Sequence, residues 1–255
     1  MGTIEVFHVE AFAKEPGKGN PAGVVWDAER LGEREMLRIA GLVGFNETAF
    51  VMPSDVADVK LKYYTPGHEI DLCGHATIAS LHSLREAGRF GDRQAIAVET
   101  NAGLLNVRFI EDGSGGSRIR MEQAAPRFVP FAGSRSLLAG AIGLEEDELD
   151  DTVPIVYGST GTWTLLVPIR RRDSFDRMMP RNRSFPDVLS EMPRASVHPF
   201  GRMADDPTAL MHARHFSSPY SGTVEDPVTG TASGVMGAYA LTYLYPERAA
   251  IEFIV

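Results

Sequence analysis

The chain lacks several features that whole classes of protein require. Cys73 is the only cysteine among 255 residues, which excludes an intrachain disulfide and indicates a reducing compartment. No run of about 18 apolar residues occurs, so we expect no membrane span. The N-terminus has no basic stretch followed by an apolar one, so we expect no signal peptide and a cytoplasmic protein. The net charge of −9 argues against nucleic-acid partners, because phosphate binding requires a basic face.

The remaining composition is that of a soluble globular protein, with 44% hydrophobic and 23% charged residues. Arginines cluster from Arg170 to Arg183, and we interpret this patch as a solvated loop. Long strand-like segments with few helices predict an α+β fold. A proline-containing stretch near 124–133 divides it into domains at 1–125 and 126–255.

Apolar spacing and turn residues place the main elements. In the first half they predict helices within 33–45 and over 74–87, with Gly88 as the stop of the second. In the second half they predict, in order, a helix over 134–143, a strand pair around 153–168, an Arg- and Pro-rich loop, a strand over 209–216 and a helix over 231–245. The final "AAIEFIV" is expected to begin a further strand.

A short internal repeat links the two halves. Cys73-Gly74-His75-Ala76-Thr77 aligns with Thr229-Gly230-Thr231-Ala232-Ser233 at a constant offset of 156, which also places Glu69 on Glu225. Each copy leads into a helix rich in small and apolar residues, a composition typical of helices enclosed by other structure. The repeat predicts two similar domains, each a curved, mostly antiparallel sheet around a central helix.

The repeated glycines fall where two helices begin. A helix N-terminus exposes unpaired N–H groups with partial positive charge, and Gly74 and Gly230 allow a ligand to approach the backbone closely. Two such termini facing each other would bind a carboxylate in a cleft between the domains. The alternative is that both glycines merely start buried helices.

The cysteine count excludes one mechanism of proton transfer. A two-thiol racemase needs two cysteines at mirrored positions, but the mirror of Cys73 is Thr229, whose hydroxyl is too weak an acid. We therefore interpret Cys73 as a packed residue beside the site rather than as the base.

Three other side chains are candidates for acid/base chemistry. Glu47 is an acid within an otherwise apolar strand entry, and buried carboxyl groups make good general acids. His75 directly follows the first turn glycine, and Asp226 precedes the second helix. Each residue also has a purely structural explanation. Glu47 could be a charge at a strand edge, His75 a structural histidine, and Asp226 a helix cap.

Two further site types are disfavoured. His68, His75 and His82 are separated by glycine and proline, and His212 and His215 would face opposite sides of a strand, so we expect no metal. The segment "GKGNPAG" lacks the ending of a P-loop and the spacing of a dinucleotide loop, so we expect no nucleotide cofactor.

With these residues assembled, the sequence resembles the PhzF-like (phenazine biosynthesis-like) isomerases, relatives of diaminopimelate epimerase and proline racemase. The matching segments span residues 9 to 234 and are "VEAFAKEPGKGNPAGVV", "GFNETAFV", "YYTPGHEIDLCGHAT" and "VEDPVTGTASG". The resemblance implies a cofactor-free isomerase with its active site between two domains. It implies that Glu47 is the acid/base, with His75 and Asp226 in the cleft and Asn20 supporting it.

The resemblance and the repeat together predict a proton shuttle on a small carboxylate, such as a cyclic amino or hydroxy acid. The carboxylate would be bound around Cys73, Gly74, Gly230 and Thr231; a homodimer is left open. Thr231 stands where the family typically has serine. The repeat also predicts a hairpin of about a dozen residues after "AAIEFIV", so we expect the chain to be truncated relative to the family. These departures keep open an alternative, a non-catalytic two-lobed binder of small anions on the same fold.

Overall fold

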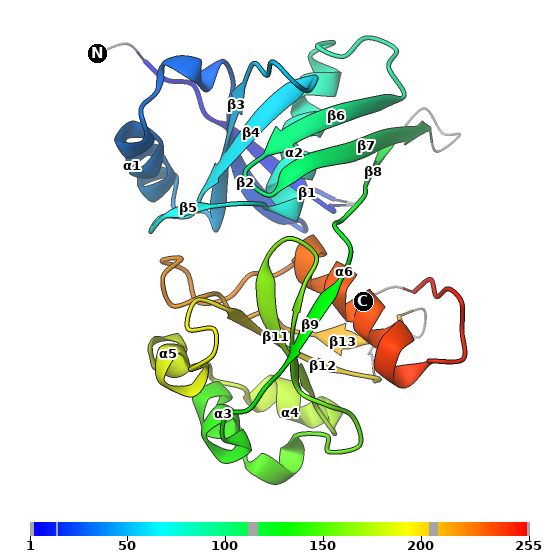
Figure 1. Cartoon of the computed structure of the whole chain (residues 1–255). Coiled ribbons are helices and arrows are strands. Elements are labelled where there is room, and N and C mark those ends of the chain that lie inside the picture. The colour runs from blue at the N-terminus through cyan, green and yellow to red at the C-terminus, as the bar shows by residue number, and fades with distance from the viewer. Residues whose placement is uncertain (1–2, 14, 112–116, 204–208, 254–255) are drawn as a thin grey trace. The chain divides into compact units, whose positions relative to one another are not determined.

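The chain divides into two compact units, Met1–Ala124 and Ala125–Val255. The structure is a computed structural model that describes residues 3–13, 15–111, 117–203 and 209–253 (Figure 1). Each unit has its own sheet and its own hydrophobic core, so each is described by itself.

The first unit is built on an eight-stranded sheet with the order β1-β2-β3-β4-β6-β7-β8, in which the short β5 pairs with β4. Most neighbours are antiparallel, but β2 pairs with β3 and β4 pairs with β6 in parallel. The strands are β1 (Phe7–Ala11), β2 (Asn20–Val25), β3 (Glu47–Met52), β4 (Val59–Tyr64), β5 (Glu69–Ile70), β6 (Ala95–Thr100), β7 (Gly103–Glu111) and β8 (Ser117–Met121).

Helix α2 (Gly74–Glu86) lies inside this curled sheet (Figure 1). The helix contacts β1 and β8, the two ends of the sheet, as well as β2 and β3 between them. Its buried positions are mostly small residues, among them Ala76, Ala79 and Ser80, which let the strands approach the helix on most sides. The sheet therefore fixes the start of α2, and with it Cys73 and His75.

Helix α1 (Glu33–Val43) and the short 3₁₀ helix η1 (Ala28–Arg30) belong to a second, smaller cluster of the first unit. Met36, Ile39 and Ala40 of α1 pack with Phe50 and Tyr64 of the sheet, and this amphipathic spacing is what predicts the helix from the sequence.

The second unit is built on a five-stranded sheet with the order β13-β12-β11-β10-β9, parallel only between β11 and β12. Its strands are β9 (Arg127–Pro130), β10 (Val156–Ser159), β11 (Trp163–Pro168), β12 (Ser196–Gly201) and β13 (His212–Ala213). Its helices are α3 (Arg135–Ile142), η2 (Glu146–Glu148), α4 (Arg172–Arg177), η3 (Asn182–Ser184), α5 (Phe185–Val188), α6 (Gly230–Tyr239) and the π-helical turn η4 (Ala240–Leu244).

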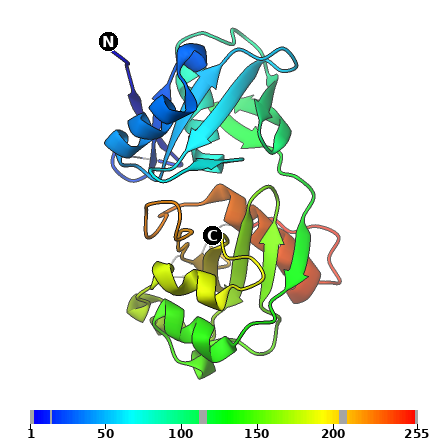
Figure 2. The ribbon, with the colours of Figure 1, turned by 60° about the vertical axis from the view of Figure 1, so that its left-hand side comes forward.

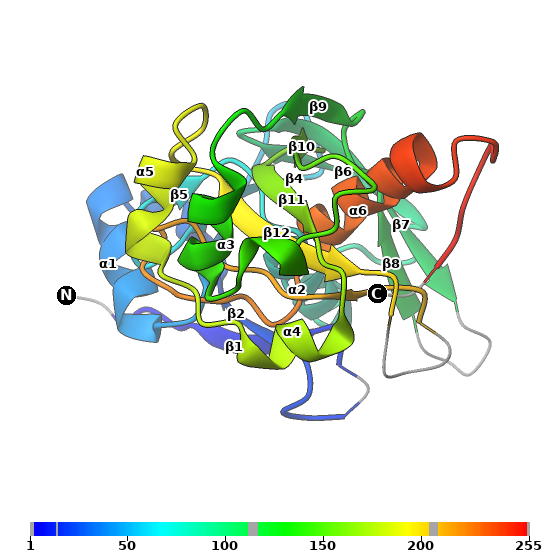
Figure 3. The ribbon, with the colours of Figure 1, turned by 90° about the horizontal axis from the view of Figure 1, so that it is seen from below.

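The two faces of this sheet carry different helices. Alternate residues such as Tyr157 and Leu165 point to a cluster with α3, α4 and α5, the helices in the foreground of Figure 3. Their neighbours Val156 and Leu166 pack instead with Val235 of α6, the orange helix beside the sheet in Figure 2. Helix α6 is thus held by one face of the sheet, which fixes where its first residues lie.

The contact between the sheet and α6 depends on Gly158, because glycine has no Cβ. A Cβ there would lie 2.7 Å from Cγ2 of Val235 and 3.0 Å from Cδ1 of Leu166. We expect Gly158→Ala to lower the free energy of unfolding by about 2 kcal/mol, because overpacking displaces the helix or the strand. Gly140→Ala in α3 is the control: no atom lies within 4 Å of the added Cβ, and alanine should stabilise the helix by about 0.5–1 kcal/mol. Urea unfolding of both variants measures this, and changes of the same sign would contradict it.

The structure confirms the mixed α+β class and corrects several details of the second half. The Arg- and Pro-rich segment is not a single loop, because it contains α4, α5 and the buried strand β12. Its arginines Arg170, Arg171, Arg177, Arg181 and Arg183 are exposed, as expected of a solvated patch. The strand expected over 209–216 is reduced to His212–Ala213 with an isolated bridge at Phe216. Residues 249–253 form no strand, because Phe253 packs against the α6 cluster instead, and Val255 lies outside the described residues.

Over the ranges that the structure describes, no helix has the length and apolar character needed to cross a lipid bilayer.

Candidate active site

The two helix starts that the repeat pairs have the same local structure. The residue before each helix, Cys73 or Thr229, is extended, with φ/ψ of −136°/119° and −119°/107°. Four residues later, Thr77 and Ser233 each donate a side-chain hydrogen bond back to that residue's carbonyl, at 2.6 and 2.8 Å. The two copies of the repeat therefore share local structure as well as sequence.

The glutamates that flank the repeat also have matching partners. Glu69 pairs with Lys62 of β4 at 3.2 Å. Glu225 accepts two hydrogen bonds from the guanidinium of Arg214, both at 2.7 Å. Each glutamate thus anchors the segment that enters a helix start, which is a supporting role.

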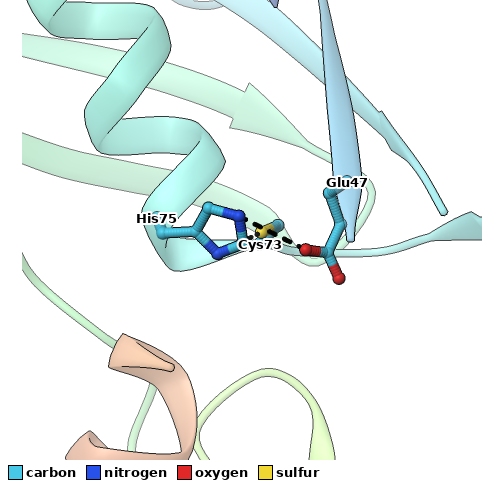
Figure 4. Close-up of side chains that lie close together, drawn as sticks. All are labelled: Glu47, Cys73 and His75. Carbon is cyan, nitrogen blue, oxygen red and sulfur yellow. Dashed lines mark hydrogen bonds and ion pairs between the residues drawn. The ribbon is translucent and has the colours of Figure 1, made fainter. Parts of the chain in front are cut away.

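In the first unit, Glu47, Cys73 and His75 come together at the start of α2 (Figure 4). Glu47 opens β3 and reaches the first turn of the helix, where Nε2 of His75 lies 3.4 Å from its Oε2. Nδ1 of the same imidazole lies 3.5 Å from Sγ of Cys73. The side chain of Glu47 remains 15% exposed while that of His75 is 2% exposed. The carboxyl group is therefore the member of this cluster that a ligand can reach most readily.

His75 is a neutral hydrogen-bonding group rather than a cation. Burial lowers its pKa to about 4, although a hydrogen bond to the backbone of Pro21 acts in the opposite direction. A neutral imidazole has one donor and one acceptor nitrogen. It can therefore orient the Glu47 carboxyl group without neutralising it.

This state of His75 predicts a pH dependence. Because its folded-state pKa lies below the ordinary value of about 6.5, the unfolded chain takes up the proton first, and stability falls as the pH drops from about 6.5 towards 4. We expect the His75 imidazole signals in an NMR titration to move with a midpoint near 4. His75→Gln should lose this part of the pH-dependent stability. A midpoint near 6.5 in the folded protein would contradict the assignment.

Cys73 is 6% exposed and belongs to the core cluster around α2. Its position at the residue before the helix places the thiol beside His75 but within the packed interior. This environment is that of the packed residue expected from the sequence, and its role in binding stays a prediction.

Asn20 lies in the same unit, at the first position of β2, and is fully buried. The next residue, Pro21, is hydrogen-bonded to His75 through its backbone. Since β2 runs beside β3, with Ala22 opposite Glu47, the segment "GNPAG" supports both the histidine and the glutamate.

In the second unit, the sequence candidates gather at the start of α6. Gly230 and Thr231 are the first two residues of the helix, and the Thr231 hydroxyl oxygen lies 3.5 Å from that of Thr229. Asp226 lines a cavity of about 300 Å³ together with Thr229 and Ser233. The backbone N–H of Asp226 donates to the carbonyl of His215 at 2.9 Å, which fixes the turn before the helix.

Two cavity-lining residues were missed as functional candidates. His198 of β12 and His215 face each other with their Nδ1 atoms 3.3 Å apart. No sequence pattern pointed to them, because His198 lies in the segment interpreted as a loop, and His215 was considered only with His212.

One cluster has the composition of a metal site. The ligand atoms of Glu47, Cys73 and His75 all lie within 4.8 Å of one another, and carboxylate, thiolate and imidazole are the ligands that zinc prefers. Only His75 of the histidine triplet considered from the sequence takes part. The expectation of chemistry without a metal or cofactor stays a prediction.

The arrangement in the first unit suits the transfer of a proton at carbon. A partly exposed carboxyl group 3.4 Å from a neutral imidazole can remove a proton from one position of a bound molecule and return it at another. Strand β2 runs beside the backbone of Glu47, and α2 holds its neighbour His75. The Glu47 carboxyl group is therefore pre-positioned.

Comparison with known proteins identifies the family and its relatives. The family model described as phenazine biosynthesis-like protein matches residues 9–253. The chain is 50% identical over 248 residues to the uncharacterized isomerase YfhB of Bacillus subtilis strain 168, covering 97% of this chain and 84% of that protein. It is 28% identical over 232 residues to the trans-2,3-dihydro-3-hydroxyanthranilate isomerase of Pseudomonas aeruginosa, covering 91% of this chain and 77% of that protein.

Solved structures also include a protein of this family and a protein with the same fold. The crystal structure of the Bacillus anthracis phenazine biosynthesis protein of the PhzF family superimposes with a TM-score of 0.89 at 53% identity, covering 96% of this chain and 82% of that one. A probable proline racemase from Agrobacterium radiobacter K84 superimposes with a TM-score of 0.63 at 16% identity, covering 94% and 77%. The second likeness shows that this chain and that protein share a fold.

Proposed function

The chain belongs to the phenazine biosynthesis-like (PhzF) family and has relatives named as isomerases, and we propose that it moves a proton on a small carboxylate by means of Glu47. The observation that carries the proposal is the 3.4 Å contact between Glu47 and the buried, neutral His75. A single acid/base that takes a proton from one carbon and returns it to another changes the position of a double bond without oxidation or a second reactant.

The substrate class follows from the groups around the two helix starts. We assign the carboxylate of the substrate to the backbone N–H groups around Gly74 and Gly230, helped by the hydroxyl of Thr231, because helix N-termini favour anions. Asp226 is assigned to a polar group of the same molecule. A cyclic amino or hydroxy acid has this combination of groups. A location of the site between the two domains stays a prediction.

The experiment that tests the proposal has two steps. Small cyclic amino and hydroxy acids are first screened for those that raise the melting temperature, since a ligand of the folded state stabilises it by mass action. Each hit is then incubated with the protein in D₂O and analysed by mass spectrometry and NMR. We expect at least one hit to gain deuterium and to be converted to an isomer. Hits that bind but never exchange or convert would overturn the enzyme assignment in favour of an anion-binding protein.

A further inference from the structure

The cavity at the start of α6 is lined by a histidine with an unsatisfied ring nitrogen. His198 is 2% exposed and lines the cavity, and its Nε2 atom has no hydrogen-bond partner among the residues that the structure describes. A buried polar atom without a partner costs free energy. Such an atom on a residue that lines a cavity of about 300 Å³ indicates a partner that enters from the cavity.

The other nitrogen of His198 is already committed. Its Nδ1 lies 3.3 Å from Nδ1 of His215, so one ring donates and the other accepts. Burial lowers the pKa of both histidines, that of His215 to about 4, which favours two neutral rings in opposite tautomers. If Nδ1 of His198 donates, its Nε2 is an acceptor; if Nδ1 of His215 donates, Nε2 of His198 carries the ring proton and is a donor.

The charges around the cavity decide which ligand group fits. Arg214 is the cation of the cavity wall, but its guanidinium is occupied by Glu225 and by the carbonyls of Phe175 and Met178. The Asp226 carboxyl group lines the same cavity. A carboxylate would therefore find no uncommitted cation there, whereas a hydroxyl or amino group can donate to Asp226 and exchange a hydrogen bond with an imidazole.

We propose that His198, with its tautomer set by His215, binds a hydroxyl or amino group of the ligand in the cavity at the start of α6. The inference rests on the proposed function, because it assigns a part of the same ligand. The cavity selects ring acids that carry a hydrogen-bonding substituent over ring acids that carry none.

The test compares two ring carboxylates, 3-hydroxyanthranilate and benzoate, which differ by one amino and one hydroxyl group. We expect calorimetry on the whole protein to show at least tenfold tighter binding of 3-hydroxyanthranilate, the value of about one hydrogen bond. His198→Phe should reduce this preference to less than about twofold. His212→Phe is the matched control: His212 lines the same cavity but packs edge-on against Phe175, so the preference should remain.

A measurement on the wild-type protein covers the case in which His198→Phe fails to fold. With ¹⁵N-labelled histidine, 3-hydroxyanthranilate should shift the Nε2 signal of His198, and benzoate should not. The inference is overturned if the wild type binds both acids equally or binds neither, if His198→Phe retains the preference, or if the signal does not move. Because binding requires no turnover, the same preference measured in Glu47→Gln separates a failure here from a failure of the proton shuttle.

Discussion

Glu47→Gln should lower the rate of proton transfer by about 10³-fold while leaving the fold intact. Glutamine keeps the shape of the side chain and its contact with His75, but it has no acidic proton to give and no carboxylate to receive one. Removal of a general acid/base typically costs 10²- to 10⁴-fold. The measurement is deuterium incorporation from D₂O into a ligand that the wild type converts, with thermal unfolding as the check on structure.

Two further variants sharpen this prediction. Glu47→Asp keeps the acid but withdraws it by one methylene from His75, so we expect an intermediate rate. Glu33→Gln changes an exposed glutamate of α1 in the same unit and should leave the rate within about twofold. Undiminished exchange in Glu47→Gln would show that another group carries the proton.

The sequence predicts those parts of the structure that depend on residues close together in the chain. The start of α2 follows from Gly74 and a run of small residues, and its end from Gly88, which has a φ of 73°. The repeat predicts matching helix starts, because the hydrogen bonds of Thr77 and Ser233 depend only on residues four positions apart. The grouping of Glu47 with His75 came from the resemblance to a family, since no local pattern brings β3 to α2.

The parts that the sequence does not predict depend on contacts between distant segments. Strand β12 lies in the segment interpreted as an Arg- and Pro-rich loop, yet it pairs in parallel with β11 in the sheet. This pairing places His198 in the cavity wall, and its partner His215 lies 17 residues away in the chain. The arginine patch is solvated, as its charge predicts, but the ion pair of Arg177 with Glu148 was not predicted, because Glu148 lies 29 residues away.

Glu148→Ala should lower the free energy of unfolding by about 3 kcal/mol, although it lies far from any candidate site residue in the sequence. Glu148 is 6% exposed and accepts hydrogen bonds from the hydroxyl of Ser174, from the guanidinium of Arg177 and from its own 3₁₀ turn. Alanine leaves the fully buried Ser174 hydroxyl without its acceptor and removes a charge-assisted bond. Urea unfolding measures the loss. Glu146→Ala, at an exposed position of the same turn, should change stability by less than about 0.5 kcal/mol.

The effect of Glu148 should also fade in acid. Burial alone would raise its pKa, but the hydrogen bonds from the Glu145 N–H, Ser174 and Arg177 outweigh it and lower the pKa to about 2, below the ordinary 4.5. A carboxyl group with a depressed folded-state pKa stabilises the protein above about pH 4.5, and this contribution is lost as the pH falls towards 2. The stability difference between wild type and Glu148→Ala should therefore shrink across this interval. A difference that stays constant down to pH 2 would mean that Glu148 acts through packing rather than through its charge.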